Sequence, residues 1–216
     1  MHNASLVTVI TPTYNRIKSL KQAIDCVQKQ TYPYWEHLIV ADGHDFRVEK
    51  LVKAMQDPRV KYFYTKRTKD LGGSQRNHAL RKAKGQLMAY LDDDNLMHKD
   101  YLKEMVKKFH SRKIGYAICY VNYHLGWRLK PRLPFKFGYI DTLNFMVRKK
   151  VVQQAGGWNG KRGQDFDLIN KVSKISRGAF VKRFLGEHRR LKLTVLDYIK
   201  NQLSFYGTKL KQVLRF

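Results

Sequence analysis

The stretch "QLMAYLDDDNLMHKDYL", residues 86–102, decides the predicted fold, because an apolar run ends abruptly at three consecutive acidic residues. A short apolar run bounded by polar residues is typical of a buried strand. Asp92, Asp93 and Asp94 stand where that strand would end. Adjacent carboxylates repel one another and need a compensating cation. Their clustering is unusual here, because the chain holds 43 Lys and Arg but only 17 Asp and Glu.

Strand and helix patterns alternate along the first half of the chain. Apolar and β-branched runs predict strands, and amphipathic spacing predicts helices: strands at 6–11, 37–43, 60–65 and 86–91, and helices at 17–27, 48–55, 73–84 and 100–109. This alternation predicts an α/β fold with a mostly parallel sheet flanked by helices, whose ligand crevice lies beyond the carboxyl ends of the strands. Asp42 and the acids at 92–94 should therefore meet in one crevice.

The second half is less regular. Residues 116–124 and 144–152 read as strands, separated by the loop "GWRLKPRLPFKFG" at 126–138. A Gly-rich segment at 153–163 then leads into a helix that we expect to begin at Asp165. The length of 216 residues suits one domain with a substantial core, and no internal repeat or linker divides it.

Positive charge is concentrated in the second half. Residues 1–100 hold 17 Lys and Arg against 11 Asp and Glu, whereas residues 101–216 hold 26 against 6, within a formal net charge of +26. Such a surface attracts polyanions: nucleic acid, an anionic membrane leaflet or a charged glycan. Solubility alone is the alternative explanation of the charge.

Cysteine usage and hydropathy predict a cytoplasmic protein, with peripheral contact at the inner face of a membrane left open. Cys26 and Cys119 lie within apolar patterns and match no metal or redox spacing, so we expect buried, reduced thiols. The first ten residues lack a basic region followed by a long apolar stretch, and no window of eighteen residues is uninterruptedly apolar.

Residues 191–216 predict a basic amphipathic helix. Leu193, Leu196, Ile199, Leu203 and Tyr206 recur at helical spacing with lysines between them. Such a helix can lie on an anionic membrane. It can also pack on the domain as its last core helix, and we favour this role.

The three acids at 92–94 predict a site for a hard divalent cation. Carboxylate and phosphate oxygens suit Mg²⁺ or Mn²⁺, and Mg²⁺ usually binds through one or two carboxylates together with substrate phosphates. A solvated acidic turn that caps the helix near Lys99 explains the same residues. Both interpretations stay open on this motif alone.

Four motifs together resemble the family 2 glycosyltransferases of the GT-A fold, in order as well as in content. They are "VTVITPTYNR" at 7–16, "HLIVADG" at 37–43, "GGSQRNHALRKAKGQLMAYLDDDN" at 72–95 and "GGWNGKRGQDFDL" at 156–168. The resemblance covers roughly residues 5–190. It implies a glycosyltransferase domain at 1–190, with a nucleotide-binding half at 1–100 and an acceptor-binding half at 101–190. The implied activity is inverting transfer of a sugar from a nucleotide-sugar to an acceptor hydroxyl.

The resemblance also implies how the donor binds. Tyr14 matches a loop aromatic that stacks on a pyrimidine, and Asp42 matches an acid that accepts the imide N–H of uracil, so UDP is the expected nucleotide and dTDP the alternative. The family often has two acids at this place, whereas this chain has Ala41 and Asp42. The other donor contacts implied are Thr11, Pro12, Arg16, Gly73, Arg76 and Asn77.

The acids at 92–94 fit the family's aspartate-x-aspartate pattern. We expect Asp94 to bind Mn²⁺ or Mg²⁺ directly, Asp92 to contact the ribose or a metal-bound water, and Asp93 to contact the donor. His188 falls where some members carry a metal-binding histidine, although a lone His is more often a surface residue. The metal would stabilise the departing nucleoside diphosphate as a Lewis acid.

Asp165 matches the acid that commonly acts as general base in the family. As an alternative, an Asp at this place is a helix N-cap. Gln164 stands where the family commonly has Glu, and Trp158 and Gly157 belong to the segment that would receive the acceptor. Trp158 would stack on a sugar or base face, with core packing as its alternative.

The acceptor stays open between two candidates: a membrane-proximal glycan or glycolipid, which we favour, and DNA that carries a hydroxylated base. A nucleotidyltransferase is a further alternative, but it would have a Gly-rich, Arg-containing loop after the first strand, which "TPTYNRIKS" lacks. A non-catalytic nucleic-acid-binding protein would explain the charge and leave the acids at 92–94 and Asp165 without a purpose. The sequence does not indicate an oligomeric state.

Overall fold

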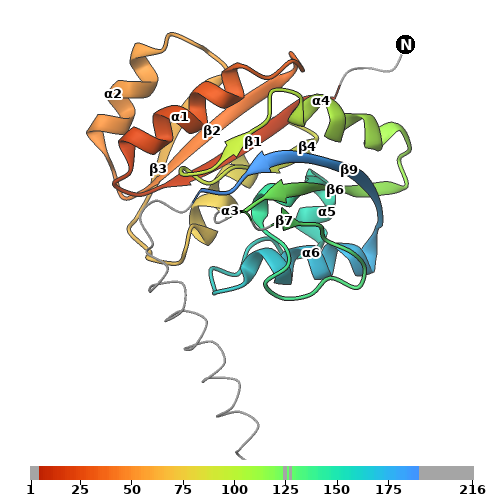
Figure 1. The fold of residues 1–216 in the computed structure, drawn as a ribbon. Coiled ribbons are helices and arrows are strands. Elements are labelled where there is room, and N and C mark those ends of the chain that lie inside the picture. Colours follow the sequence, from red (N-terminus) through yellow and green to blue (C-terminus); the bar gives the residue numbers. More distant parts are fainter. Residues whose placement is uncertain (1–4, 124–125, 127, 190–216) are drawn as a thin grey trace, which may run out of the picture.

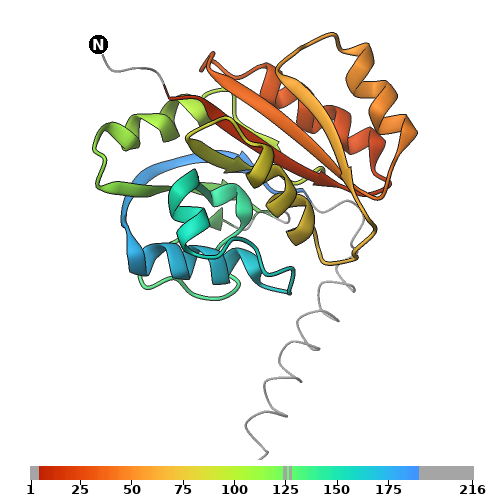
Figure 2. The same ribbon diagram turned by 180° about the vertical axis from the view of Figure 1, so that it is seen from behind.

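The computed structural model describes residues 5–123, 126 and 128–189, which form a mixed β-sheet with helices on both faces (Figures 1 and 2). The strands are β1 (Val7–Thr13), β2 (Trp35–Asp42), β3 (Val60–Thr65), β4 (Leu87–Tyr90), β5 (Leu96–Met97), β6 (Ile114–Asn122), β7 (Arg128–Leu129), β8 (Phe145–Arg148) and β9 (Arg177–Glu187). The α-helices are α1 (Ile17–Gln28), α2 (Phe46–Ala54), α3 (Gly73–Lys82), α4 (Tyr101–Val106), α5 (Lys149–Gln154) and α6 (Gln164–Ile175). Two short 3₁₀ helices are η1 (Lys107–His110) and η3 (Thr142–Asn144).

The sheet has the order β3-β2-β1-β4-β8-β6-β9-β5, and β7 pairs with β6. Strands β3, β2, β1 and β4 are parallel, as the alternating pattern predicts. From β8 onward the pairings are mixed: β4 with β8, β6 with β8, β6 with β7 and β5 with β9 are antiparallel, and β6 with β9 is parallel. The expectation of a mostly parallel sheet is therefore confirmed, and its antiparallel pairings are the short ones from β8 onward.

Both faces of the sheet are covered, which explains why its central strands are almost continuously apolar. In β1, Val7 and Val9 face a core formed with α1, α2 and α4, whereas Ile10 faces a second core formed with α3, α5 and α6. Successive residues of a strand point to opposite faces, so one apolar strand serves both cores. Figure 1 shows α1, α2 and α4 on one side of the sheet and α3, α5 and α6 on the other.

Two parts of the second half differ from the prediction. Residues 149–152, expected to continue the strand at 144–152, belong instead to helix α5, because the strand ends at Arg148. Val151 and Val152 pack into the core from this helix. Strand β9, which the sequence pattern does not predict, pairs along β6. Cys119 is buried and Cys26 partly buried, both as free thiols.

The predicted helix at 191–216 lies outside the described residues. Within the described ranges, every helix is too short or too polar to cross a bilayer.

Candidate functional site

A cavity of about 650 Å³ opens at the carboxyl ends of β1, β2 and β4, where parallel α/β sheets place their ligand crevices. It brings together side chains far apart in the sequence, including Tyr14, Arg16, Asp42, Arg76, His188 and the acids 92–94. The convergence of Asp42 with the acidic cluster, predicted from the strand ends, is confirmed.

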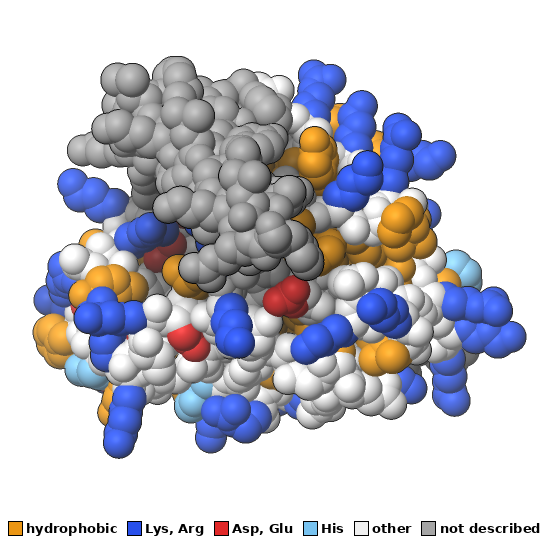
Figure 3. Space-filling model, turned by 90° about the horizontal axis from the view of Figure 1, so that it is seen from below, with side chains coloured by type: hydrophobic (Ala, Val, Ile, Leu, Met, Phe, Trp, Pro, Cys, Tyr) orange, Lys and Arg blue, Asp and Glu red, His pale blue; other side chains and the backbone are white. Residues whose placement is uncertain are grey.

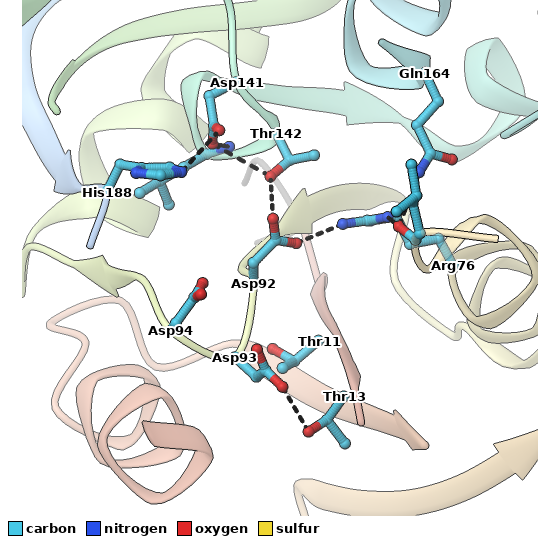
Figure 4. A network of polar contacts seen from close by, with 12 residues as sticks. Thr11, Thr13, Arg76, Asp92, Asp93, Asp94, Asp141, Thr142, Gln164 and His188 are labelled. Atoms are coloured by element: carbon cyan, nitrogen blue, oxygen red, sulfur yellow. Dashed lines mark hydrogen bonds and ion pairs between the residues drawn. The ribbon is translucent and has the colours of Figure 1, made fainter. Parts of the chain in front are cut away.

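Arg16 supplies the cation that the acidic cluster needs in this structure. Its Nη1 atom donates to Asp93 Oδ1 at 3.1 Å and to Asp94 Oδ2 at 2.8 Å. Asp93 is buried and also accepts a hydrogen bond of 2.7 Å from the Thr13 hydroxyl (Figure 4). Asp93 is therefore fixed by two side-chain partners, whereas Asp94 pairs with Arg16.

Asp92 points away from Asp94, toward α3 and η3 (Figure 4). Its carboxylate forms a short ion pair with the buried guanidinium of Arg76 and accepts a weak hydrogen bond of 3.4 Å from the Thr142 hydroxyl. The Arg76 guanidinium in turn lies over the Trp158 ring, 4.7 Å from its centroid. Arg76 is thus locked in place, and it neutralises Asp92.

The carboxylates at 92–94 lie close enough to repel one another, and this repulsion affects their pKa values. Burial, followed by the charges of Asp92 and Asp93, raises the pKa of Asp94 to about 7. Burial also raises the pKa of Asp93, against the lowering effect of its hydrogen bonds from Thr13 and Arg16. The corner around Asp94 therefore favours a further positive charge.

Asp141 is a site residue that the sequence analysis missed. It precedes η3, accepts the Leu143 backbone N–H at 2.9 Å, and its Oδ2 atom lies 3.6 Å from His188 Nε2. Burial and the nearby charge of Asp92 raise the pKa of Asp141. In the sequence Asp141 resembles an ordinary helix-capping Asp, so no local signal distinguishes it.

The carboxylates of this corner suit a hard divalent ion that takes its remaining ligands from a bound substrate. Among the described residues, no three His, Cys, Asp or Glu side chains stand together as a ready metal site. Mg²⁺ sites, however, often use one or two protein carboxylates plus phosphates. Asp92 and His188 are engaged with Arg76 and Asp141, so Asp94 is the carboxylate best placed to bind such an ion.

Tyr14 and Asp42 lie together at the other end of the cavity, and Arg67 contacts both. The Arg67 Cζ atom lies 3.4 Å from the centroid of the Tyr14 ring, and its Nε atom lies 3.2 Å from Asp42 Oδ2. Asp42 also accepts hydrogen bonds from the Thr68 backbone N–H at 2.8 Å and from Gln75 Nε2 at 2.9 Å. A flat cation thus stacks on the aromatic ring and forms an ion pair with the carboxylate.

Thr11 was expected to contact the nucleotide-sugar, and the structure corrects this expectation. It is fully buried within β1, and its hydroxyl lies 2.8 Å from His37 Nε2 of the neighbouring strand. Since it faces the core, it does not contact the cavity, whereas Pro12 and Arg16 do.

Asn77 and Trp158 are hydrogen-bonded to each other, through the Asn77 side chain and the Trp158 backbone. Asn77 donates to the Trp158 carbonyl at 2.8 Å and accepts the Trp158 backbone N–H at 2.9 Å. The Trp158 ring is 4% exposed and packs edge-on against Tyr90, 4.8 Å between centroids. The structure corrects the expectation of a stacking surface at Trp158, and core packing is the observed alternative.

Gly73, Gly157 and Gln164 have a similar structural role. A Cβ on Gly73 would lie 2.5 Å from Gly160 Cα, and one on Gly157 would lie 2.6 Å from Asn77 Oδ1. Gln164 is 7% exposed and donates to the Leu71 carbonyl at 2.9 Å. These contacts press the Gly-rich segment against the start of α3, and it is Gly72 that lines the cavity.

Asp165 is the second residue of α6, and the N-cap is Gly163 with φ of 79°, so the capping alternative is wrong. Burial, followed by the charge of Asp141, raises the pKa of Asp165 to about 7. The charges of Arg76 and Asp92 also act on it, so Asp165 lies on the side of the site where these two residues meet. Asp165 does not line the cavity itself, and its role as general base stays a prediction.

Relatives and solved structures resemble the chain over different lengths. An uncharacterized glycosyltransferase of Rickettsia conorii is 32% identical over 123 residues, which are 56% of this chain and 20% of that protein. The UDP-Glc:alpha-D-GlcNAc-diphosphoundecaprenol beta-1,3-glucosyltransferase WfgD of Escherichia coli is 31% identical over 120 residues, 56% of this chain and 46% of that protein. The chain spans less than half the length of these two relatives.

The fold is shared with the mannosyltransferase PcManGT from Pyrobaculum calidifontis, solved in complex with GDP-Man and Mn²⁺. The TM-score is 0.74 at 18% identity, over 100% of this chain and 66% of that one. This likeness confirms the predicted GT-A fold. The family model described as glycosyl transferase family 2 matches residues 8–183, which are most of the sequence. The chain therefore belongs to glycosyl transferase family 2.

Proposed function

We propose that the protein is a metal-dependent, inverting glycosyltransferase that moves a sugar from a nucleotide-sugar, with UDP as the expected nucleotide, to a hydroxyl of a membrane-associated glycan or glycolipid. The observation that carries this proposal is the single cavity that joins Tyr14 and Asp42 to the acids 92–94. A nucleotide needs an aromatic face and a polar edge at one end and compensated phosphates at the other. The cavity offers both.

The volume and the lining support a nucleotide-sugar. A cavity of about 650 Å³ falls in the size range of small-molecule sites, about 300–1,000 Å³. The Tyr14 ring offers a stacking face, and Asp42 offers an acceptor for an imide N–H. Arg16 and Arg76 bring two guanidinium groups to the same cavity, and planar guanidinium groups pair well with phosphate oxygens.

Asp94 is the residue proposed to hold Mn²⁺ or Mg²⁺. When bound, such an ion supplies Lewis-acid stabilisation to a departing diphosphate. Arg16, whose side chain is 53% exposed, pairs with Asp94 in the structure and can turn toward a phosphate when another cation replaces it.

Asp165 is the proposed general base. Because its pKa is raised to about 7, its carboxylate can accept a proton from an acceptor hydroxyl near neutral pH. Attack by that hydroxyl opposite the leaving group is a single displacement and inverts the anomeric configuration.

The choice of acceptor rests on charge and on one relative. The Escherichia coli relative is named for a diphosphoundecaprenol-linked acceptor, and the second half of this chain has 26 Lys and Arg against 6 Asp and Glu. Both favour an acceptor at an anionic membrane, and with it a peripheral location at the cytoplasmic face. A purely nucleic-acid-binding role leaves the buried carboxylates of the cavity unexplained.

Mass spectrometry of donor turnover tests the proposal. The protein is incubated with a panel of UDP-sugars and with GDP-mannose, in Mn²⁺, in Mg²⁺ and in EDTA. We expect release of nucleoside diphosphate from one donor class with metal and none in EDTA. Absence of release from every donor, together with no thermal shift by UDP and Mn²⁺, would remove the enzymatic proposal.

A further inference from the structure

We propose that the segment 130–139, here called the basic apolar loop, docks the protein onto an anionic lipid surface. The loop connects β7 to the residues before η3 and runs along the lower side of the molecule in Figure 1. This inference depends on the proposed function in one respect, namely that the acceptor is attached to a membrane.

Three large apolar side chains of the loop face solvent. Leu133 is 56% exposed, Phe137 42% and Tyr139 63%. Amphipathic surfaces that bind bilayers present such side chains to the boundary between headgroups and acyl chains. Three within seven residues exceed the scattered single exposed apolar residues that are normal for a protein surface.

The loop holds these side chains outward because other residues anchor it. Phe135 is 7% exposed and packs edge-on against Tyr116, 6.1 Å between centroids, and Ile140 is 5% exposed. Single buried residues therefore stand between exposed runs at 132–134 and 136–139, and they anchor the loop on either side of the exposed side chains. Their exposure is a consequence of the packed fold.

Exposed basic side chains are interspersed with the exposed apolar ones, and the loop itself contains no acidic residue. Lys130, Arg132 and Lys136 are exposed, and no Asp or Glu occurs between residues 128 and 140. Lys161 and Arg162 are exposed on the Gly-rich segment, which meets the loop where Phe137 packs next to Gly163. Figure 3 shows hydrophobic side chains interspersed with Lys and Arg on this lower face. An anionic headgroup layer complements that charge.

A lipid surface fits this combination better than nucleic acid does. Phosphate and base contacts use basic, polar and aromatic side chains. An exposed Leu133 adds nothing to them, whereas insertion among acyl chains removes its apolar surface from water.

The loop is joined directly to the site. Asp141 follows it in the chain, and the Phe137 ring packs edge-on against Phe166, the neighbour of Asp165, with 5.8 Å between centroids. A bilayer that contacts the loop would therefore lie next to the acceptor side of the cavity. Docking would bring a lipid-linked hydroxyl to the site.

Vesicle sedimentation with the full chain tests the proposal, without any donor. The vesicles contain phosphatidylcholine alone or phosphatidylcholine with roughly 30% phosphatidylglycerol, which represents an anionic leaflet. Leu133→Ser with Tyr139→Ser should weaken binding to the anionic vesicles at least about tenfold, because two inserted side chains are lost. Arg132→Gln with Lys136→Gln should weaken it about 30-fold, since each basic residue near the surface contributes roughly fivefold.

A matched control changes equally exposed apolar residues elsewhere. Tyr34 is 54% exposed and Ile175 52%, so Tyr34→Ser with Ile175→Ser should leave vesicle binding unchanged. Slower amide hydrogen exchange of residues 130–139 on vesicles is the second expected result, and it needs no variant.

Wild-type vesicle binding by the Leu133 and Tyr139 variant would overturn the proposal. If that variant also loses binding to duplex DNA at moderate salt, the loop binds nucleic acid. If it instead abolishes a dimer that the wild type forms in solution, the loop binds a second copy of the chain. Failure of donor turnover leaves this test untouched, so the two proposals fail separately.

Discussion

At the scale of single residues, Asp94 is set apart from its two neighbours by its partners. Thr13 and Arg16 hold Asp93, and Arg76 and Thr142 hold Asp92. Asp94 has an exposed Arg16 as its partner and a pKa raised to about 7. A carboxylate whose charge is poorly compensated is the natural ligand for an incoming cation.

Asp94→Asn should therefore abolish the dependence of UDP binding on Mn²⁺. Isothermal titration with UDP, with and without Mn²⁺, measures this. Asp25→Asn on α1, outside the cavity lining, is the matched control and should bind UDP and Mn²⁺ like the wild type. Wild-type binding by Asp94→Asn would assign the metal to other residues.

Arg67→Ala should tighten UDP binding about fivefold. Arg67 stacks on Tyr14 and pairs with Asp42, the two contacts proposed for the base, so the base must displace it. An exposed cation–π contact and an exposed ion pair are together worth about 1 kcal/mol. Lys66→Ala, an exposed cation one position away, is the control. Weaker UDP binding by Arg67→Ala would show instead that Arg67 contacts the nucleotide.

Asp165→Asn should lower the turnover number by about 10²–10⁴ and leave the KM for the donor unchanged. In the wild type, the raised pKa of about 7 means that the carboxyl is protonated at lower pH, so transfer should fall as pH decreases through about 7. Initial rates between pH 5.5 and 8.5 at saturating donor are the measurement. A variant with the wild-type rate would place the base elsewhere, with Asp141 as the next carboxylate to change.

At the scale of elements, β1 and β2 are joined across the sheet by Thr11 and His37. Burial lowers the pKa of His37 to about 3, so the folded protein keeps it neutral. The unfolded chain binds a proton near its ordinary pKa of about 6.5. His37 thus contributes stability above that value and loses it as pH falls toward 3.

Urea unfolding at pH 7.5, 6 and 5 should show this loss, about 1.4 kcal/mol per pH unit below pH 6.5 from His37 alone. Because the carboxyls with raised pKa values act in the opposite direction, the informative quantity is the difference between the wild type and His37→Gln. The wild type should lose more stability on acidification than this variant. Equal pH dependence in both proteins would mean that His37 is protonated in the fold.

The elements that the sequence predicts best are those whose side-chain period is regular. The strand at 60–65 has the predicted bounds, and the helix patterns at 17–27 and 48–55 match α1 and α2 to within two residues. Strand β9 escaped prediction because its solvent side carries Lys182 and Arg183 and its apolar residues follow no clean alternation. Its pairing with β6 has register shifts, which no local pattern encodes.

The site was predictable to the extent that strand ends define it. Asp42 and the acids 92–94 follow strands, so their meeting follows from parallel topology. Asp141 comes from an antiparallel return of the chain, and its closeness to His188 depends on β8 and β9. For Trp158 the prediction failed in the opposite sense. The motif suggested that its ring stacks on a ligand, but the ring is buried in the core.

At the scale of the whole molecule, the sheet changes character at β4. On one side of it lie the parallel strands, with Asp42 at the end of β2 and Tyr14 directly after β1. On the other lie the mixed strands, with Asp141 shortly before β8 and His188 directly after β9. The acids 92–94 follow β4 itself. The position between the two halves therefore explains why one cavity joins Tyr14 and Asp42 to the acids 92–94 and His188.

The net charge of +26 should make the stability of the whole fold depend on salt. Folding brings like charges together, and exposed ion pairs such as Arg59–Asp57 contribute at most about 1 kcal/mol each. Raising NaCl from about 0.01 M to about 0.1 M shortens the screening length from about 30 Å to about 10 Å. We expect Tm to rise by about 2–4 °C for each 1 kcal/mol of repulsion that screening removes. Differential scanning calorimetry measures this, with 0.1 M glycine as a non-screening control. A fall in Tm with salt would show that attractive ion pairs outweigh the repulsion. The basic surface would then be compensated within the fold. It would have little free charge to attract an anionic bilayer.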